Sequence, residues 1–209
     1  MGHVTSHLPE ARSPAVWRLS RSMYDGSKQC ARGPRSLARR LRSAIYSRLV
    51  SQLGRFKRAQ DEPHSGFATA LAELRAGRKT GHWIWYVFPQ LSGLGRSEVS
   101  QTYGIVDVTE ATEYLRDPVL RGRLLSAATA VVERQRAGVP LSHLMGAPLD
   151  VFKLVSSLTL FGPIARRLQA TEANDEYRLL ADVAGEILAG AESEGYPLCR
   201  PTLRSLEQS

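Results

Sequence analysis

Apolar residues recur every three or four positions through most of the chain beyond Arg55, which is the spacing of helices with one buried face. Residues typical of helix ends stand between these segments, such as Asp117-Pro118 at a start and Gly77 at an end. The pattern therefore predicts one soluble, mainly helical domain. Helices are expected over residues 67–77, 98–103, 107–115, 117–138, 150–161 and 176–188, and around Leu203 to Leu206.

Two of these helices carry specific expectations. The helix from Asp150 is expected to stop at Phe161, because Gly162-Pro163 follows and proline breaks helices. The helix over residues 176–188 is expected to bury one side. That side consists of Leu179, Leu180, Val183 and Ile187.

Residues 83–88, with the sequence Trp-Ile-Trp-Tyr-Val-Phe, do not follow the helical pattern. Their aromatic and β-branched content favours a strand, but a run this short fits a buried helix equally well. No second clear strand is present to pair with them. We therefore expect a buried helical turn or a short helix here.

The first fifty residues are rich in Arg, Ser, Pro and Gly and hold ten Lys or Arg against two acids. Leu37, Leu41, Ile45 and Leu49 recur every four positions among arginines, as in a basic amphipathic helix. Residues 1–54 are interpreted as a basic leader, and residues 55–206 as the helical domain. Three interpretations of the leader stay open: a disordered extension or mis-assigned start, an organelle-targeting peptide, and an arm that binds a membrane surface or nucleic acid.

Charge is distributed unevenly between the leader and the domain. The net charge of +8 lies entirely in residues 1–50, because residues 51–209 hold 18 of the 28 bases and 18 of the 20 acids. A nucleic-acid-binding surface requires clustered basic residues. Nucleic acid is therefore expected to bind, if at all, only through the leader.

Several other classes of protein lack support in the sequence. The two cysteines, Cys30 and Cys199, are too few for a disulfide scaffold and indicate a reducing compartment, so a cytoplasmic location is expected unless the leader directs the chain to an organelle. No spacing of Cys and His predicts a metal site, and Gly93-Leu94-Gly95 is too short for a dinucleotide fingerprint. No metal, cofactor or membrane span is predicted, and the oligomeric state is left open.

Two segments carry an unusual pattern of residues. The first reads H-W-x-W-x-x-F-P-Q-L-x-G-L-G-x-S from His82 to Ser97, followed by Tyr-Gly-Ile at 103–105. The second reads D-x-x-K-x-x-S-S-x-T-L-F from Asp150 to Phe161. In these segments the chain resembles the bacterial family catalogued as domain of unknown function 1810, although the family usually has Ala at the position of Ser100.

The resemblance covers roughly residues 55–206 and implies an all-α, compact single-domain helical fold of cytoplasmic type. It implies no activity. Some members of the family carry the label calpastatin, but a calpain inhibitor of that kind is a disordered, repetitive chain, unlike residues 55–206.

The polar residues of the two segments suggest a binding site. Lys153 lies in a strongly apolar helix, one turn after Asp150 and one turn before Ser156 and Ser157, and a lysine there must reach solvent, pair or serve a site. If His82 and Gln90 meet this helix beneath the tryptophans, an aromatic pocket with a cation results. The expected ligand-binding residues are Trp83, Trp85, Gln90, Ser156, Ser157 and Thr159.

Such a pocket suits a nucleotide- or ADP-ribose-like small molecule, with its base on tryptophan and its anionic group on lysine. If the domain is an enzyme, which the sequence does not decide, the reaction to test first is hydrolysis of an N-glycosidic or ADP-ribosyl bond. His82 or Asp150 would be the acid or base and Lys153 the charge stabiliser. The NADAR family of ADP-ribosyl hydrolases offers only an analogy in size and composition.

Each of these residues also has a structural interpretation. Trp83, Trp85 and Phe88 fit a hydrophobic core better than a stacking platform, since aromatic residues dominate cores. Asp150 also fits as a helix cap paired with Lys153 at the surface, and His82 as a structural histidine. The alternative function is accordingly a non-catalytic helical interaction module, or nucleic-acid binding through the leader.

Overall fold

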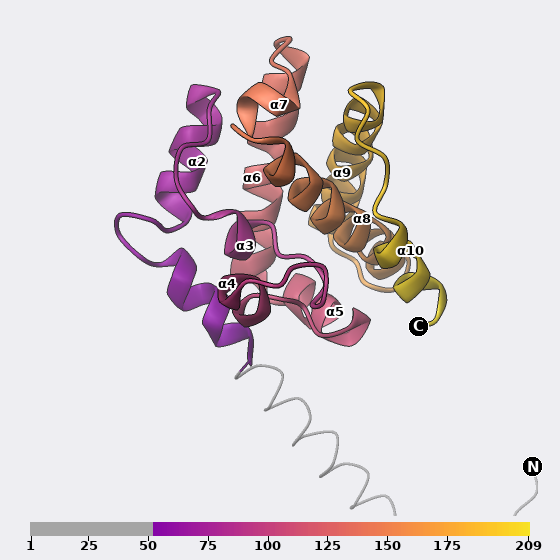
Figure 1. The fold of residues 1–209 in the computed structure, drawn as a ribbon. Helices are drawn as coiled ribbons and strands as arrows, with labels where there is room; N and C mark the ends of the chain where they lie inside the picture. The colour runs from indigo at the N-terminus through magenta and orange to yellow at the C-terminus, as the bar shows by residue number, and fades with distance from the viewer. Residues whose placement is uncertain (1–51) are drawn as a thin grey trace, which may run out of the picture.

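The computed structural model describes residues 52–209, and within them helices follow one another without any strand paired into a sheet (Figure 1). A single parallel bridge joins Leu91 and Ile105. The expected all-α fold is confirmed. Residues 52–60 are helical and are followed by α2 (Phe67–Ala76), α3 (Ile84–Val87), α4 (Glu98–Thr102), α5 (Val108–Arg116), α6 (Pro118–Arg136), α7 (Leu141–Leu144), α8 (Pro148–Thr171), α9 (Asp175–Ser193) and α10 (Arg200–Glu207).

Most helix ends lie where the sequence predicts them, because local side chains bind the free backbone groups there. The carboxylate of Asp117 accepts hydrogen bonds from the first backbone N–H groups of α6, and that of Asp107 accepts one from Glu110 N at 2.8 Å. Gly77 ends α2 with φ of 87°, a left-handed conformation that suits glycine. Residues 84–87 form the expected short helix, α3.

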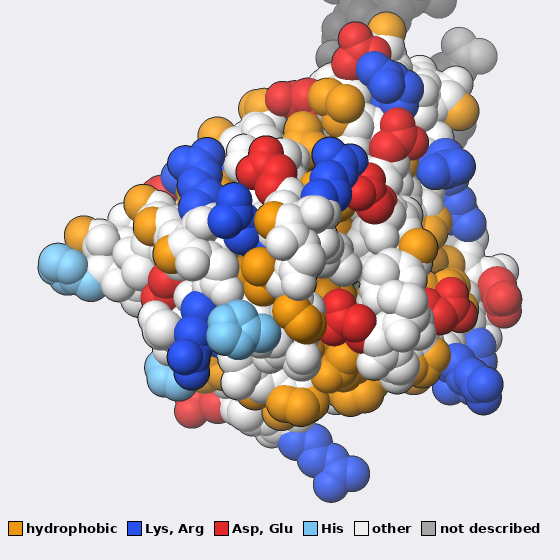
Figure 2. All heavy atoms as spheres, turned by 90° about the horizontal axis from the view of Figure 1, so that it is seen from above, with side chains coloured by type: hydrophobic (Ala, Val, Ile, Leu, Met, Phe, Trp, Pro, Cys, Tyr) orange, Lys and Arg blue, Asp and Glu red, His pale blue; other side chains and the backbone are white. Residues whose placement is uncertain are grey.

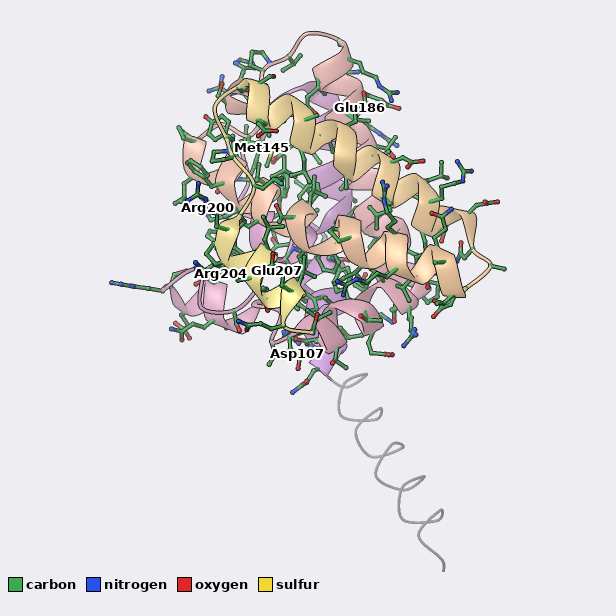
Figure 3. All side chains as sticks on the ribbon, turned by 90° about the vertical axis from the view of Figure 1, so that its right-hand side faces the viewer. Asp107, Met145, Glu186, Arg200, Arg204 and Glu207 are labelled. Atoms are coloured by element: carbon green, nitrogen blue, oxygen red, sulfur yellow. The ribbon has the colours of Figure 1, made fainter. Side chains whose placement is uncertain are left out.

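The core forms around α8, which crosses the middle of the molecule in Figure 1 and packs on α5, α9 and α10. This helix is long and apolar enough to span a membrane by length and composition, but 67% of its apolar window is buried inside the domain. That burial is typical of a core helix. Figure 3 shows α10 lying across α8, with the exposed Arg200 and Arg204 labelled on it.

The expected end of the helix at Phe161 is wrong, because α8 continues through Pro163 to Thr171. Proline removes one backbone hydrogen bond, but the residues on both sides of it, from Phe161 to Ala165, are buried apart from Pro163 itself. Gly162 contributes to this packing, since a Cβ at this position would lie 3.2 Å from Cβ of Ala184 on α9. Burial against α9 therefore outweighs the local cost of the proline.

The expected buried side of α9 is found at Leu180 and Ile187, with Val183 packed against the core, but the expectation is wrong for Leu179. Leu179 is 44% exposed, whereas Tyr177, Leu180, Ala184 and Ile187 are buried. The sequence placed the large residue at 179 in the core, but alanines on α9 allow the helix to approach α8 and α6 closely. Small residues thus make up much of the contact between these helices.

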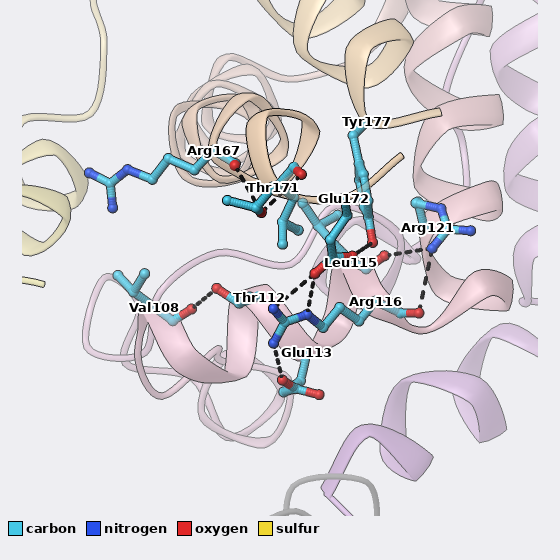
Figure 4. Close-up of polar contacts among 11 residues, drawn as sticks. Val108, Thr112, Glu113, Leu115, Arg116, Arg121, Arg167, Thr171, Glu172 and Tyr177 are labelled. Atoms are coloured by element: carbon cyan, nitrogen blue, oxygen red, sulfur yellow. Dashed lines mark hydrogen bonds and ion pairs between the residues drawn. The ribbon is translucent and has the colours of Figure 1, made fainter. Parts of the chain in front are cut away.

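A polar cluster joins the end of α5 to the turn between α8 and α9 (Figure 4). The guanidinium of Arg116 donates to Glu113 and to Glu172, and Glu172 also accepts a hydrogen bond from the hydroxyl of Tyr177 at 3.0 Å. Arg121 donates to the carbonyl of Leu115 at 2.9 Å. These contacts fix the entry of α9 relative to α5 and α6.

The described core begins with Leu53, two residues before the expected start of the domain at Arg55. The predicted amphipathic segment over residues 34–50 lies outside the described residues. Figure 2 shows the upper face of the molecule, where Lys and Arg side chains are interspersed with Asp and Glu. This face therefore carries no stripe of basic residues.

Candidate functional site

A tight turn between α2 and α3 is held by one carboxylate, that of Glu73. It accepts hydrogen bonds from the backbone N–H groups of Thr80 and Gly81, from the hydroxyl of Thr80 and from Nε1 of Trp83 at 2.7 Å. Burial by itself would raise the pKa of Glu73, but these donors outweigh it and lower the pKa to about 2. The turn thus presents Lys79 and Trp83 in fixed positions.

Two lysines from different parts of the chain share the carboxylate of Asp150 on α8. Nζ of Lys79 lies 2.6 Å from Oδ2 of Asp150, and Nζ of Lys153 lies 2.8 Å from Oδ1. Lys79 also donates to the carbonyl of Gly81 at 2.6 Å. Burial favours the neutral form of Asp150, but the two lysines outweigh it, and the pKa of Asp150 is lowered below its usual value.

Beside this cluster lies a pocket of about 450 Å³ between α8 and the segment from α3 to α4. Nζ of Lys153 stands 4.2 Å from the centre of the Trp85 ring and covers one face of it. Of the two aromatic residues in the lining, Phe152 is the more exposed, at 46%, and its ring centre lies 5.1 Å from that of Tyr196. The pocket is lined by Trp85, Gln90, Leu94, Gly95, Arg96, Ser97, Ser100, Leu149, Phe152, Lys153 and Ser156.

The backbone around the pocket is fixed by two local features. The carbonyl of Gln90 accepts a hydrogen bond from Ile105 N at 2.9 Å, which anchors the chain just beyond α3. Gly95 passes so close to α4 that a Cβ there would lie 2.7 Å from Ser100. Only glycine permits this approach, which brings the neighbouring Arg96 and Ser97 to the rim.

Two polar side chains in the wall have no protein partner. Gln90 is 9% exposed and Ser156 is 8% exposed, and both line the pocket. Among residues 52–209, neither side chain makes a hydrogen bond. The polar atoms of both side chains are accessible from the pocket, so they offer donors and acceptors to a molecule inside it.

The structure brings together four of the residues that the sequence suggested for the site: Trp85, Gln90, Lys153 and Ser156. Asp150 lies behind Lys153 and does not line the pocket. The remaining four residues lie elsewhere. His82 is exposed outside the pocket, Trp83 is in the core, and Ser157 and Thr159 face the interior of the domain.

The positions of these four residues have simple geometric causes. Trp83 and Trp85 are two residues apart in a helical turn and so point to different sides. Thr159 uses its hydroxyl on the carbonyl of Val155 at 2.7 Å, as threonine often does within a helix. Oγ of Ser157 is buried without a partner among the described residues, on a side of α8 away from the pocket.

Sequence reasoning did not select Lys79 or Glu73, although both hold the site in place. Lys79 stands just before the aromatic segment, but nothing in the spacing shows that it meets Asp150, which is seventy-one positions later. Arg96, Leu149 and Phe152 were also missed as lining residues. For Leu149 and Phe152 the sequence does contain one signal. Each is an apolar residue next to a charged one, Asp150 or Lys153, at the beginning of a helix.

The acid–base chemistry of the site is limited by its geometry. Both oxygens of Asp150 are occupied by lysines, and its lowered pKa keeps it ionised at neutral pH. No group of three or more His, Cys, Asp or Glu residues that could hold a metal ion occurs in residues 52–209. The arrangement can supply positive charge, an amide, a hydroxyl and an apolar wall to a ligand.

The fold and site define a small all-α domain with a pocket beside two lysines that share one carboxylate. The sequence profile of the family described as "Protein of unknown function (DUF1810)" matches residues 50–178. The chain therefore belongs to this family, as its motifs predict.

A crystal structure of similar fold is that of the conserved hypothetical protein Rv1873 from Mycobacterium tuberculosis. It is 35% identical, with a TM-score of 0.55, and the match covers 73% of the present chain and 94% of the other. No curated protein matches the chain significantly.

Proposed function

We propose that the pocket binds a nucleotide-like small molecule, meaning a small anion that carries a flat heterocycle. The observation that carries this proposal is the pair of residues Gln90 and Ser156, whose amide and hydroxyl make no hydrogen bond among residues 52–209 and are accessible to a molecule in the pocket, beside a lining that is mainly apolar. The volume of about 450 Å³ falls in the range of small-molecule sites. A ligand in the pocket would supply hydrogen-bond partners to both groups.

The parts of the pocket match the parts of such a ligand. Gln90 carries both a donor and an acceptor and can bind the edge of a heterocycle, as amide side chains do with bases. Lys153 and Arg96 supply the positive charge for a phosphate. Because Lys153 covers one face of Trp85, the exposed ring of Phe152 is the surface on which a heterocycle would stack.

The proposal is for binding and does not include hydrolysis. His82 lies outside the pocket, and Asp150 is an ionised carboxylate held by two lysines, so neither is placed as a general acid in contact with a ligand. In this proposal Lys153, which the sequence suggested as a charge stabiliser, binds the anionic group of the ligand.

The experiment is a thermal-shift and calorimetric titration of the full chain with AMP, ADP-ribose and NAD. A ligand at one hundred times its Kd adds about 2.7 kcal/mol to stability. The variants Gln90→Leu and Ser156→Ala are expected to be as stable as the wild type or more stable by up to about 1 kcal/mol, and to lose the ligand response. Matched controls are Gln169→Leu and Ser142→Ala, which change exposed residues outside the pocket.

Two results would count against the proposal. One is the absence of any response of the wild type to these three compounds. The other is an undiminished response of both Gln90→Leu and Ser156→Ala.

A further inference from the structure

Lys79, Asp150 and Lys153 form a largely buried cluster with one negative and two positive charges. Their side chains are only 7%, 15% and 13% exposed. Each lysine contacts a different oxygen of the same carboxylate, at 2.6 and 2.8 Å. The cluster therefore has a net charge of +1, which an anion in the adjoining pocket would balance.

The other charged groups near the cluster do not cancel this charge. The carboxylate of Glu73 on α2 binds the 80–83 turn, but within residues 52–209 it makes no ion pair of 4.0 Å or less with either lysine. Its oxygens are already used by the turn and by Trp83. Arg96 lines the same pocket and adds a further positive charge.

The two lysines of the cluster differ in what they can reach. Lys153 lines the pocket and hydrogen-bonds only to Asp150 among the described residues, so part of its donor capacity faces the pocket. Lys79 does not line the pocket, and its ammonium group contacts the carbonyl of Gly81 and the carboxylate of Asp150. Its charge balances Asp150, which would otherwise neutralise Lys153.

We infer that Lys79 is a positioning residue that makes the pocket selective for anions, because it balances Asp150 and leaves the charge of Lys153 to the ligand. The inference rests on the proposed function for the pocket itself. It goes further than that function in two ways. It states that the pocket selects ligands by their anionic group, and it assigns this selectivity to Lys79, which the ligand does not touch.

The test changes the charge of the cluster in steps of one. Lys79→Met lowers the cluster from +1 to 0, Asp150→Asn raises it to +2, and the double variant Lys79→Met/Asp150→Asn returns it to +1. Inorganic phosphate and AMP should bind most tightly to Asp150→Asn, about equally to the wild type and the double variant, and most weakly to Lys79→Met. Each step is expected to change Kd roughly tenfold, the scale of one charge acting over several ångströms in a protein.

A neutral probe and a matched variant separate charge from structural damage. Adenosine, which lacks the phosphate, should bind the wild type and Lys79→Met with the same Kd. Arg78→Met removes one charge from the exposed neighbouring residue and should leave the Kd of phosphate unchanged. If Lys79→Met does not fold, the comparison of wild type, Asp150→Asn and the double variant still measures the effect of the cluster charge.

The inference is overturned if Lys79→Met weakens adenosine and AMP equally, if the double variant does not recover, or if phosphate and AMP both fail to bind the wild type. These outcomes are distinct from failure of the proposed function. Phosphate binding in the expected order without any AMP, ADP-ribose or NAD binding would support the inference and reject the nucleotide. Nucleotide binding without the expected order of Kd values among the variants would support the proposed function and reject the inference.

Discussion

Trp83 and Trp85 are two positions apart and have different environments. The ring of Trp83 is fully buried, bonds through Nε1 to Glu73 and packs at 6.5 Å from the ring of Phe88. Trp85 is partly buried, with Lys153 over one face and the pocket beside it. Trp83 therefore stabilises the hydrophobic core, and Trp85 forms part of the wall of the pocket.

Replacing the two tryptophans should separate these roles. Trp83→Ala is expected to cost about 3–5 kcal/mol, the usual range for emptying a large buried site. Trp85→Ala is expected to cost less than about 2 kcal/mol, since its ring is only partly buried. Urea unfolding of the full chain measures both values, and equal losses would place Trp85 in the core.

Glu73 should make stability depend on pH in acid. Its folded pKa of about 2 lies below its ordinary value of 4.5, so folding favours the ionised form. The stability that it contributes is fully present above pH 4.5 and is lost as the pH falls through this window toward 2. Asp150, whose pKa is also lowered, adds to the effect in the same direction.

The variant Glu73→Gln tests this dependence. It is expected to be less stable than the wild type at pH 7 by roughly 1–2 kcal/mol, because charge-assisted hydrogen bonds are lost. The difference should shrink as the pH falls below 4.5. Urea unfolding across this range measures it, with Glu207→Gln on the exposed end of α10 as the control (Figure 3). A difference that does not vary with pH would contradict the assigned role of the Glu73 carboxylate.

Helix α8 shows how contact between elements overrides local preference. Its interior holds both Gly162 and Pro163, which disfavour helix, yet the helix continues for two further turns. The glycine lies where α9 approaches, and beyond the proline Ile164, Ala165 and Leu168 are buried. The stability of this segment thus comes from packing between α8 and α9.

Glycine replacements in three helices should report this contact. Gly122→Ala in α6 and Gly185→Ala in α9 are expected to stabilise the protein by about 0.5–1 kcal/mol each, since no atom lies within 4 Å of the added Cβ. Gly162→Ala should give no such gain, because its Cβ would meet Ala184 at 3.2 Å. Thermal or urea unfolding measures the stability of the three variants. An equal gain in stability for Gly162→Ala would show that α8 and α9 can move apart at little cost.

The molecule as a whole divides into a basic N-terminal part and a domain with balanced charge. The core described here includes Leu53 and extends to Leu206. Within the described residues, the helices surround one hydrophobic core that is continuous from α2 to α10. This continuity indicates that the domain folds as a unit.

We accordingly expect residues 51–209 to fold without the first fifty residues. Circular dichroism should show a helical spectrum and a cooperative melt close to that of the full chain, because the capping residues and the core are retained. Loss of the cooperative transition on truncation would show that the leader contributes to the core.

Short-range features were predictable from the sequence because they depend on neighbouring residues. The caps at Ser97, Asp107 and Asp117 form within one helical turn, and α3 follows from a run of apolar residues with no strand to pair with. The polar residues of two motifs also indicated a site. Gln90 and Lys153 do line the pocket that the structure contains.

Tertiary structure alone decided which residues meet. The continuation of α8 past Pro163 depends on burial against α9, and the pairing of Lys79 with Asp150 depends on how the turn at 79–83 packs on α8. The same packing left His82 outside the pocket and placed Trp83 in the core. Hydrogen bonds and charges between distant residues have no periodic signature in the sequence, so the polar groups of the site could be named from the sequence while their partners could not.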